Sequence, residues 1–403
     1  MLDAYIYDGL RSPIGRHAGA LATIRPDDLA AQLIQALVAR AGFPLADYED
    51  VILGSTNQAG EDCRNFARYA GLLAGLPVET GGQTVNRLCA SGLAAVIDAA
   101  RAVSCDEGNL FVAGGVEMMS RAPFVMAKAE SAYSREMKVF DSTMGARFPN
   151  LRFNATFGDD PMPQTADNIA RDLGITREAS DAFALGSQQK YAAALAAGFF
   201  DNEIHAVTLP AARNGVAPIV VTADEHPRPQ TDTAGLAKLR PLFDGGVVTA
   251  GNASGINDGG AVLVVGSKTA GERHGVYPRA RILAAASAGV PPRVMGLGPV
   301  PAIAKALTRA GLTLDQMDVI EINEAFAAQV LGCTRQLGLT DDDCRLNPNG
   351  GAIAIGHPLG CSGARLILTA LRQLEQTGGR YAVVALCIGI GQGLAAVIER
   401  LDA

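Results

Sequence analysis

The pattern of hydrophobic positions predicts a strand, a turn and a helix near the end of the first quarter of the chain. Leu93, Val96 and Ile97 have the i, i+3, i+4 spacing of an amphipathic helix. A short strand at 83–86 precedes this helix, so Cys89 falls where the strand turns into the helix. Unpaired N–H groups and the helix dipole favour a thiolate there, as a nucleophilic cysteine requires. The alternative interpretation is a small buried side chain that fills a tight turn.

The same order of elements recurs in the second half of the chain. Residues 50–52 and 318–320 both read Asp-Val-Ile, and each is followed by a Ser-Gly pair, at Ser91 and Ser362, in a helix rich in alanine and leucine. The two copies have similar spacing, and a strand of buried type follows each helix. A duplicated β/α unit explains this shared order better than chance does. We therefore predict an α/β protein with largely parallel sheets that are covered by helices.

The repeat divides the chain into two halves with an insertion between them. At 403 residues the chain is too long for a single ordinary core. The insertion combines irregular polar stretches, as at 131–154, with a helix at 177–197. Long insertions commonly carry ligand contacts, so we interpret this one as a loop domain that covers the site. The expected domains are an N-terminal half at 1–118 that is completed by 250–270, the loop domain at 119–249, and a C-terminal half at 271–403.

Composition narrows the class of protein. A hydrophobic fraction of 48% supports real cores, and a net charge of −7 argues against a nucleic-acid partner. No apolar run reaches the roughly 18 residues of a membrane span, and the first residues lack the features of a signal peptide. The seven cysteines form no CxxC pair and no zinc-site spacing with histidine, so we expect no metal and no disulfide framework. These features predict a cytoplasmic protein without a membrane or nucleic-acid partner.

Three motifs in the second half lie where strands meet turns or helices. Asn323 follows a strand at 319–322, His357 lies between glycine and proline before a helix, and Cys387 ends a buried strand. Asn323 is also a natural helix N-cap, and that alternative stays open. The backbone after Cys387 reads GxGxG rather than the GxGxxG of a dinucleotide site. Two cysteines and one histidine beside glycine-rich backbone, which can present N–H donors, suit acyl transfer through a thioester.

These motifs resemble those of the thiolase family, and the resemblance covers essentially the whole chain. The family's fold is a duplicated, five-layered α/β/α/β/α arrangement with a loop domain inserted in the first half, which we expect here. The implied reaction uses coenzyme A (CoA) as a co-substrate with small-molecule acyl-CoA substrates and no permanently bound cofactor. The resemblance also implies a homodimer or homotetramer. The matching segments are Asn-Arg-Leu-Cys-Ala-Ser-Gly at 86–92, Asn-Glu-Ala-Phe at 323–326, Gly-Gly-Ala-Ile-Ala-Ile-Gly-His-Pro at 350–358 and Cys-Ile-Gly-Ile-Gly at 387–391.

The resemblance implies a role for individual residues of these motifs. Cys89 corresponds to the nucleophile that accepts the acyl group, and His357 to the group that takes its proton. Cys387 corresponds to the acid/base that handles the proton of the acetyl-CoA enolate. Asn323 would hold a water that forms one oxyanion hole with His357, and the N–H groups of Cys89 and Gly389 would form the other. The residues that would contact CoA or wall the acyl pocket are Ser254, Ala253, Arg228, Met162, Phe326 and Ala325.

Within the family, the chain is most similar to β-ketoadipyl-CoA (3-oxoadipyl-CoA) thiolases. It shares with them the patterns at 60–65 and 120–126, and it has Pro161 where acetoacetyl-CoA thiolases have a histidine before the loop-domain methionine. The implied reaction cleaves 3-oxoadipyl-CoA with CoA into acetyl-CoA and succinyl-CoA. A carboxylate at the end of the acyl chain needs a positive partner, and Arg147 in the loop domain is a candidate. The alternative is that Arg147 is a solvated surface residue.

Other interpretations stay open at this point. An acetyl-CoA acetyltransferase (acetoacetyl-CoA thiolase) or a broad-range 3-ketoacyl-CoA thiolase would use the same residues. A decarboxylating condensing enzyme would carry a second histidine, or a histidine and an asparagine, where this chain has Cys387. A non-catalytic, lipid-binding member of the fold would be expected to have lost Cys89, His357 or Cys387. Cys361 lies four residues after His357, where a small residue in a tight turn explains it without chemistry.

Overall fold

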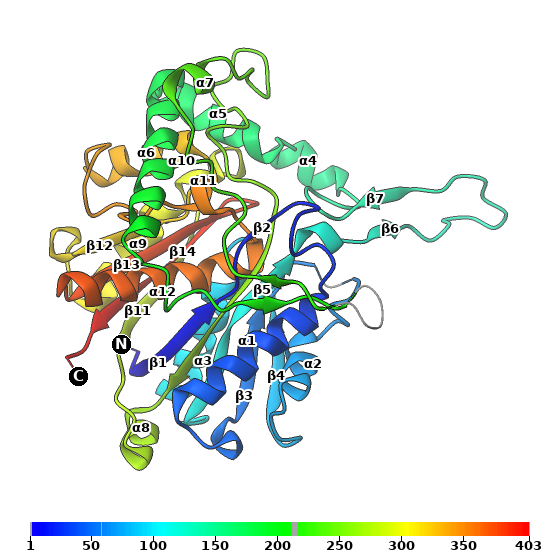
Figure 1. The fold of residues 1–403 in the computed structure, drawn as a ribbon. Helices are drawn as coiled ribbons and strands as arrows, with labels where there is room; N and C mark the ends of the chain where they lie inside the picture. Colours follow the sequence, from blue (N-terminus) through cyan, green and yellow to red (C-terminus); the bar gives the residue numbers. More distant parts are fainter. Residues whose placement is uncertain (1, 58, 212–216, 403) are drawn as a thin grey trace.

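The computed structural model describes residues 2–57, 59–211 and 217–402, and its core is built on one long sheet (Figure 1). In sheet order, the first half contains β4 (Gly81–Val85), β3 (Asp50–Gly54), β5 (Leu110–Met118), β10 (Asn257–Gly266) and β1 (Ala4–Arg11), with the short β2 (Gly15–Arg16) paired to β10. The second half contains β11 (Ala280–Gly289), β14 (Gln392–Arg400), β13 (Tyr381–Ile388) and β12 (Val319–Ile322). β1 pairs with β11, which joins the two halves at their edges.

The sheet is mixed, which corrects the expectation of largely parallel sheets. Among the described strands of this sheet, β3 is parallel to β4 and β5, and β12 is parallel to β13, while the remaining neighbours run antiparallel. β13 and β14 are joined by residues 389–391, and so short a turn connects only antiparallel strands. The expectation failed because hydrophobic runs look alike in buried strands of either direction.

Helices lie in three layers, one between the two halves of the sheet and one on the outer side of each half. α3 (Ser91–Ser104) and α12 (Leu359–Thr377) form the middle layer and share one buried cluster with strands of both halves. α1 (Pro26–Ala41) and α2 (Phe66–Leu73) cover the first half, and α9 (Pro299–Ala310) and α10 (Ala327–Leu337) cover the second. The expected five layers, α/β/α/β/α, are thus confirmed. Two short helices, α8 (Lys268–His274) and α11 (Ala352–Ile355), lie in connections.

The two middle helices touch at the glycines of their Ser-Gly pairs. A Cβ atom on Gly363 would collide with the backbone of Leu93, and one on Gly92 would collide with the carbonyl of Gly360. Because glycine has no side chain, the two backbones can meet directly at these positions. The repeat that the sequence predicts therefore holds the first turns of α3 and α12 side by side.

The insertion between β5 and β10 forms helices against the core and an arm that projects from it (Figure 1). The predicted helix at 177–197 is confirmed as α6 (Arg177–Ala196). The stretch at 131–154 was expected to be irregular, yet it contains β7 (Val139–Asp141) and the start of α4 (Leu151–Phe157), so that expectation is partly wrong. Asn150 caps α4 by accepting two backbone N–H groups, a local signal outside the hydrophobic pattern. The other strands and α-helices in the described part of the insertion are β6 (Phe124–Met126), α5 (Met162–Leu173), β8 (Val207–Thr208), β9 (Val220–Val221) and α7 (Thr233–Ala237).

The helices also bear on the expectation that no segment spans a membrane. None of the helices in the described part of the chain is both long enough and apolar enough to cross one.

Candidate active site

Cys89 lies in the turn between β4 and α3, as the sequence predicts. Leu88 adopts a positive φ of 48°, and the turn ends at the helix N-cap, Ala90. The side chain of Ser91 ties the turn together, because it accepts the N–H of Arg87 at 2.9 Å and donates to the Leu88 carbonyl at 2.6 Å. Strained backbone of this kind is concentrated at functional sites.

Cys89 is a thiol rather than a thiolate in the resting protein. Burial raises its pKa to about 11 and outweighs the N–H groups of Gly389 and of Cys89 itself, which lower the pKa. The residue as a whole is nevertheless partly accessible to solvent. The helix terminus therefore does not produce a thiolate by itself, because α3 begins two residues later and desolvation is the larger effect. To become a nucleophile, Cys89 needs a base.

His357 has the protonation state that such a base requires. Ser362 donates its hydroxyl to the Pro358 carbonyl at 2.9 Å, so at 2.6 Å it accepts the proton of His357 Nδ1. Nε2 is then unprotonated, and it accepts from Nδ2 of Asn323 at 3.3 Å. Burial, followed by the charge of Arg365, lowers the pKa of His357 to about 3, so the imidazole is neutral.

Asn323 lies beside this histidine and is not a helix N-cap. The N-cap of α10 is Phe326, three residues further on, so that alternative is wrong. The backbone N–H of Asn323 donates to the Ala385 carbonyl of β13 at 3.0 Å. Its side chain is buried, and Oδ1 has no hydrogen-bond partner among the described residues. A buried amide oxygen without a partner is costly, so this position suits a polar ligand atom or a water.

Cys387 is buried at the end of β13. Burial, followed by the effect of a charge on Cys89, raises its pKa well above the ordinary value, so Cys387 keeps its proton. The N–H of Gly389, in the turn after Cys387, and the N–H of Cys89 both point at the Cys89 sulfur. Two convergent N–H donors are the usual means of binding a developing oxyanion.

A cleft between the insertion and the core contains two of the positions that were expected to contact CoA. Arg228 and Ala253 line the cleft, and Arg228 is exposed. Ala253 pairs with Phe326, and Ser254 donates its N–H to the Ala325 carbonyl at 2.9 Å. Ala325 and Phe326 in turn belong to the buried cluster that contains the second cysteine of the site. The cleft and the reactive groups are therefore connected through this pair of segments.

Two further expected positions lie in the insertion. Met162 opens α5, and its sulfur is 3.8 Å from the point that a Cβ on Gly389 would occupy. Arg147 is half-buried, with Nη2 3.5 Å from the carbonyl of Ser142. Burial raises the pKa of Asp62, and the charge of Arg147 lowers it, so these two side chains are neighbours. The structure thus brings Met162 to the site, while the role of Arg147 stays a prediction.

Glu324 is a buried residue whose importance the sequence reasoning missed. Its carboxylate accepts the side chains of Asn347 at 2.9 Å and Ser187 at 2.7 Å, and the N–H of Ile353 at 3.1 Å. These partners come from α6 and from the glycine-rich segment that leads to His357. Glu324 therefore ties three parts of the site together. Its place in the Asn-Glu-Ala-Phe motif was the available signal.

Glu117, on β5, is a second buried carboxyl group that the sequence did not reveal. It accepts the N–H groups of Thr56 and Gly360, each at 2.9 Å. Burial raises its pKa to about 7. Because Gly360 is in the first turn of α12, Glu117 fixes that turn, and hence the neighbouring His357, against the first half of the sheet. No sequence signal distinguishes it, since its partners are backbone groups far away in the chain.

This chain is similar to known proteins over its full length. The family described as "Thiolase, N-terminal domain" matches residues 4–269, and "Thiolase, C-terminal domain" matches residues 276–400. The chain is 57% identical to a β-ketoadipyl-CoA thiolase of Acinetobacter baylyi and 55% identical to a 3-oxoadipyl-CoA/3-oxo-5,6-dehydrosuberyl-CoA thiolase of Escherichia coli, with 100% of each chain covered in both cases. A crystal structure of human mitochondrial 3-ketoacyl-CoA thiolase in complex with CoA superposes with a TM-score of 0.90 at 37% identity, covering 100% of this chain and 98% of that one.

The hydrogen bonds of His357 predict its protonation state in solution. Because Ser362 holds the Nδ1 proton and burial lowers the pKa to about 3, His357 should stay neutral, with its proton on Nδ1, from about pH 5 to pH 8. Nitrogen NMR shifts of labelled histidine would measure this, with the His357→Asn spectrum assigning the signal. In Ser362→Ala the Nδ1 partner is lost, and the fraction with the proton on Nε2 should rise. Protonation of His357 near neutral pH would contradict the assignment.

Proposed function

The chain belongs to the thiolase family, whose members are acyltransferases, and we propose that it cleaves 3-oxoadipyl-CoA with CoA to give acetyl-CoA and succinyl-CoA. The observation that carries the proposal is the backbone contact between the first turns of α3 and α12, which follow Cys89 and His357, together with the uncharged states that burial gives to both thiols and to the imidazole. The substrate is supported by the full-length relatives, which are named for 3-oxoadipyl-CoA, and by Pro161 in place of the histidine of acetoacetyl-CoA thiolases.

In the first step, Cys89 forms an acyl-enzyme. His357 Nε2 takes the Cys89 proton, and the thiolate attacks the 3-oxo carbon. The N–H groups of Cys89 and Gly389, which already point at this sulfur, stabilise the alkoxide that forms. The bond between the second and third carbons then breaks, and its electron pair leaves as the enolate of acetyl-CoA. Asn323, through a water, and His357 stabilise that enolate oxygen, which explains why a buried amide oxygen without a partner is kept at this position.

In the second step, Cys387 completes the exchange. It donates its proton to the enolate carbon, which gives acetyl-CoA and leaves a thiolate at Cys387. This thiolate takes the proton of an incoming CoA thiol, and the CoA thiolate attacks the Cys89 thioester. The bond to Cys89 breaks to release succinyl-CoA, and the Cys89 thiolate that leaves takes its proton back from His357. The raised pKa of Cys387 suits this role, because the group must carry a proton when the enolate forms.

The insertion at 119–249 is proposed to act as the loop domain that covers the CoA site. The cleft is lined by Gln188 of α6, by residues 226–239 and, from the core, by Ala253 and Ile353. CoA would occupy this cleft as a co-substrate, with Arg228 near its phosphates and Ser254, Ala253 and Ala325 along its pantetheine arm. Phe326 and Met162 would form part of the wall of the acyl pocket. On this proposal the N-terminal half is 1–118 with 250–270, and the C-terminal half is 271–403.

The two cysteines are predicted to be separable by mutation. Mixing the enzyme briefly with acetyl-CoA should add one acetyl group to the peptide that contains Cys89. Cys387→Ala should still be acetylated, but its cleavage of 3-oxoadipyl-CoA should fall by roughly 10²- to 10⁴-fold, the contribution of a general acid/base. Mass spectrometry and a steady-state assay measure the two effects.

Cys361→Ala is the matched control, since Cys361 is equally buried and follows His357 closely in the chain. It should change neither acetylation nor cleavage. Acetyl label on Cys387 or Cys361, or an equal loss of both steps in Cys387→Ala, would contradict the division of roles. Loss of both steps is instead expected for Cys89→Ala.

Substrate choice is predicted to depend on the terminal carboxylate of the acyl chain. We propose that Arg147 binds it, because the side chain is half-buried in the insertion. The enzyme should then prefer 3-oxoadipyl-CoA to uncharged 3-oxohexanoyl-CoA by about 10- to 100-fold in kcat/KM, the value of one partly buried charged contact. Arg147→Ala should narrow this gap and leave turnover of acetoacetyl-CoA unchanged, whereas the exposed Arg152→Ala should alter neither. A preference for the uncharged chain would exclude the dicarboxylate substrate, and an unchanged preference in Arg147→Ala would exclude this arginine alone.

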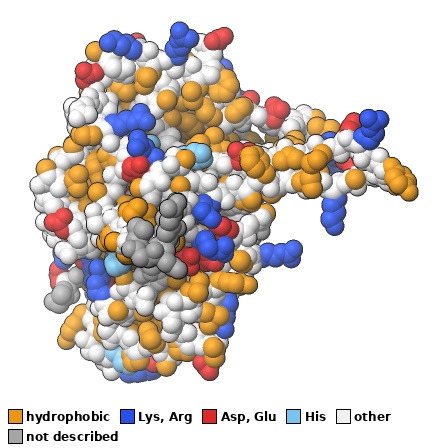
Figure 2. Space-filling view, turned by 45° about the vertical axis from the view of Figure 1, so that its right-hand side comes forward, with side chains coloured by type: hydrophobic (Ala, Val, Ile, Leu, Met, Phe, Trp, Pro, Cys, Tyr) orange, Lys and Arg blue, Asp and Glu red, His pale blue; other side chains and the backbone are white. Residues whose placement is uncertain are grey.

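A homo-oligomer, either a dimer or a tetramer, is proposed from the arm at 124–141. Its apolar side chains are exposed, Tyr133 fully and Phe124 to 76%, and they follow the projecting part of the surface (Figure 2). Exposed apolar patches of this kind commonly mark protein interfaces. Sedimentation equilibrium should give two or four times the chain mass of 41.7 kDa, and Phe124→Asp should lower it. Tyr277→Asp, at 77% exposure outside the arm, is the control, and an unchanged mass in Phe124→Asp would remove the arm from the interface.

A further inference from the structure

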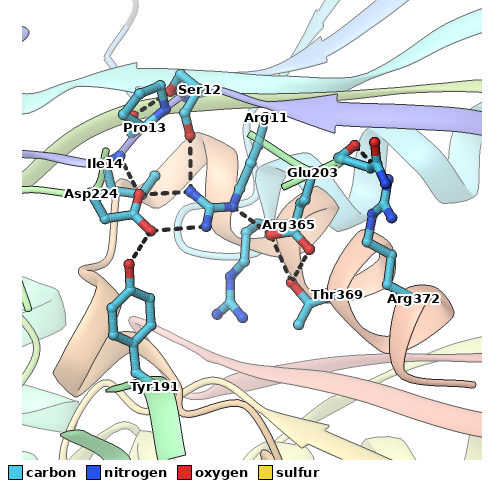
Figure 3. Close-up of polar contacts among 12 residues, drawn as sticks. Arg11, Ser12, Pro13, Ile14, Tyr191, Glu203, Asp224, Arg365, Thr369 and Arg372 are labelled. Carbon is cyan, nitrogen blue, oxygen red and sulfur yellow. Dashed lines mark hydrogen bonds and ion pairs between the residues drawn. The ribbon is translucent and has the colours of Figure 1, made fainter. Parts of the chain in front are cut away.

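The segment 224–228 carries Arg228 into the cleft, and a buried ion pair fixes where it starts. The side chain of Asp224 is fully buried. Its two oxygens accept Nη1 and Nη2 of Arg11 at 2.7 and 2.9 Å, the hydroxyl of Tyr191 at 2.9 Å and the N–H of Ile14 at 2.8 Å (Figure 3). Four donors on one carboxylate leave this side chain a single position, since losing any of them would leave a buried polar group unpaired.

Arg11 is itself held from several directions. It is the last residue of β1, and its Nε pairs with the carboxylate of Glu203 while Nη1 also donates to the Ser12 carbonyl at 3.0 Å. Its guanidinium lies 5.3 Å from the centre of the Phe200 ring, which stacks on Tyr191 at 5.2 Å. Arg11 therefore connects the C-terminal end of β1, a strand in the middle of the sheet, to the segment 224–228 that leads into the cleft.

The other end of the segment, at Arg228, is held by α6, the helix that contains Tyr191. Oε1 of Gln188 accepts the N–H of Arg228 at 2.9 Å, and its Nε2 donates to the Ile353 carbonyl at 3.2 Å. Gln188 and Tyr191 are three residues apart in α6, so they lie on one face of the helix. That face thus holds Asp224 by its side chain and Arg228 by its backbone. The guanidinium of Arg228 itself stays exposed in the cleft.

We propose that Arg11, Asp224 and Tyr191 are positioning residues that act on CoA binding through Arg228. The buried ion pair fixes residues 224–228, and this keeps the Arg228 guanidinium directed at a phosphate-bearing part of CoA. This inference rests on the proposed use of CoA in the cleft. It adds that the affinity for the phosphate-bearing end of the ligand is set by a network that touches neither the ligand nor the reactive thiols.

Tyr191→Phe gives the sharpest test, because it removes one hydroxyl and keeps the ring stacked on Phe200. The KM for CoA should rise by about 5- to 10-fold, as expected when one charge-assisted contact is weakened, while kcat stays within about twofold. Turnover of a 3-oxoacyl thioester of N-acetylcysteamine, with N-acetylcysteamine in place of CoA as the acceptor thiol, should not change, because neither molecule carries phosphates. Asp224→Asn should raise the KM for CoA further. Tyr48→Phe is the matched control, since the Tyr48 hydroxyl is buried with no partner among the described residues.

A double-mutant cycle separates positioning from a general structural effect. If Tyr191 acts through Arg228, then Tyr191→Phe should add no further rise in KM once Arg228 is replaced by Gln. Additive effects, or an equal loss of kcat with CoA and with the truncated thioester, would overturn the inference. Calorimetric titration of the wild-type enzyme and of Tyr191→Phe with CoA tests the proposed function and the positioning role separately. No CoA binding would overturn the proposed function, whereas CoA binding that Tyr191→Phe leaves unchanged would overturn the positioning role alone.

Discussion

Backbone contact between the first turns of α3 and α12 is the constraint on which the site depends. Cys89 precedes one of these helices and His357 precedes the other, so the reactive groups can meet only if the two helix ends meet. Side chains at the contact would prevent this. Glycine is therefore present on both helices, at Gly92, Gly360 and Gly363, and a Cβ on Gly115 of β5 would also strike the Gly360 carbonyl. Glu117 then secures the same turn through the N–H of Gly360.

Burial leaves the reactive groups without charge in the resting protein. The pKa of Cys89 is raised to about 11, that of Cys387 is raised well above its ordinary value, and that of His357 is lowered to about 3. Each shift has desolvation as its largest cause, and each favours the neutral form. Isolated charges at this depth would cost several kcal/mol, whereas neutral thiols and imidazole cost far less. Charge separation between Cys89 and His357 is then favoured only when convergent N–H donors and the substrate are present to stabilise it.

The sequence carried much of the fold but little of its long-range geometry. The helix after Cys89, the helix at 177–197 and the duplicated unit follow from local periodicity, and the structure has all three. The strand directions do not follow from local periodicity. β10, for example, pairs with β1 on one side and β5 on the other, and each pair joins segments more than a hundred residues apart. Likewise, the motifs select Cys89, His357, Cys387 and Asn323 as candidate residues, whose roles stay predictions. The helix-end argument nevertheless gave the wrong ionisation state for Cys89, because desolvation depends on neighbours that no local pattern contains.

Buried polar contacts, in addition to apolar packing, fix the position of the insertion on the core. One stretch of α6 bonds to the core at Glu324 through Ser187 and at Ile353 through Gln188. The same stretch holds Arg228 and Asp224 of the insertion, and Asp224 in turn bonds to Arg11 of the core. Apolar surfaces tolerate sliding, but a buried donor that loses its acceptor costs about 1–3 kcal/mol, so each bond penalises a shift of the helix. The insertion has no counterpart in the second half of the repeat and so cannot use the repeat's own packing to find its place. The hydrogen bonds of Ser187, Gln188 and Tyr191 in α6 fix its position instead. This explains why these three polar residues, which follow no visible sequence pattern, are buried.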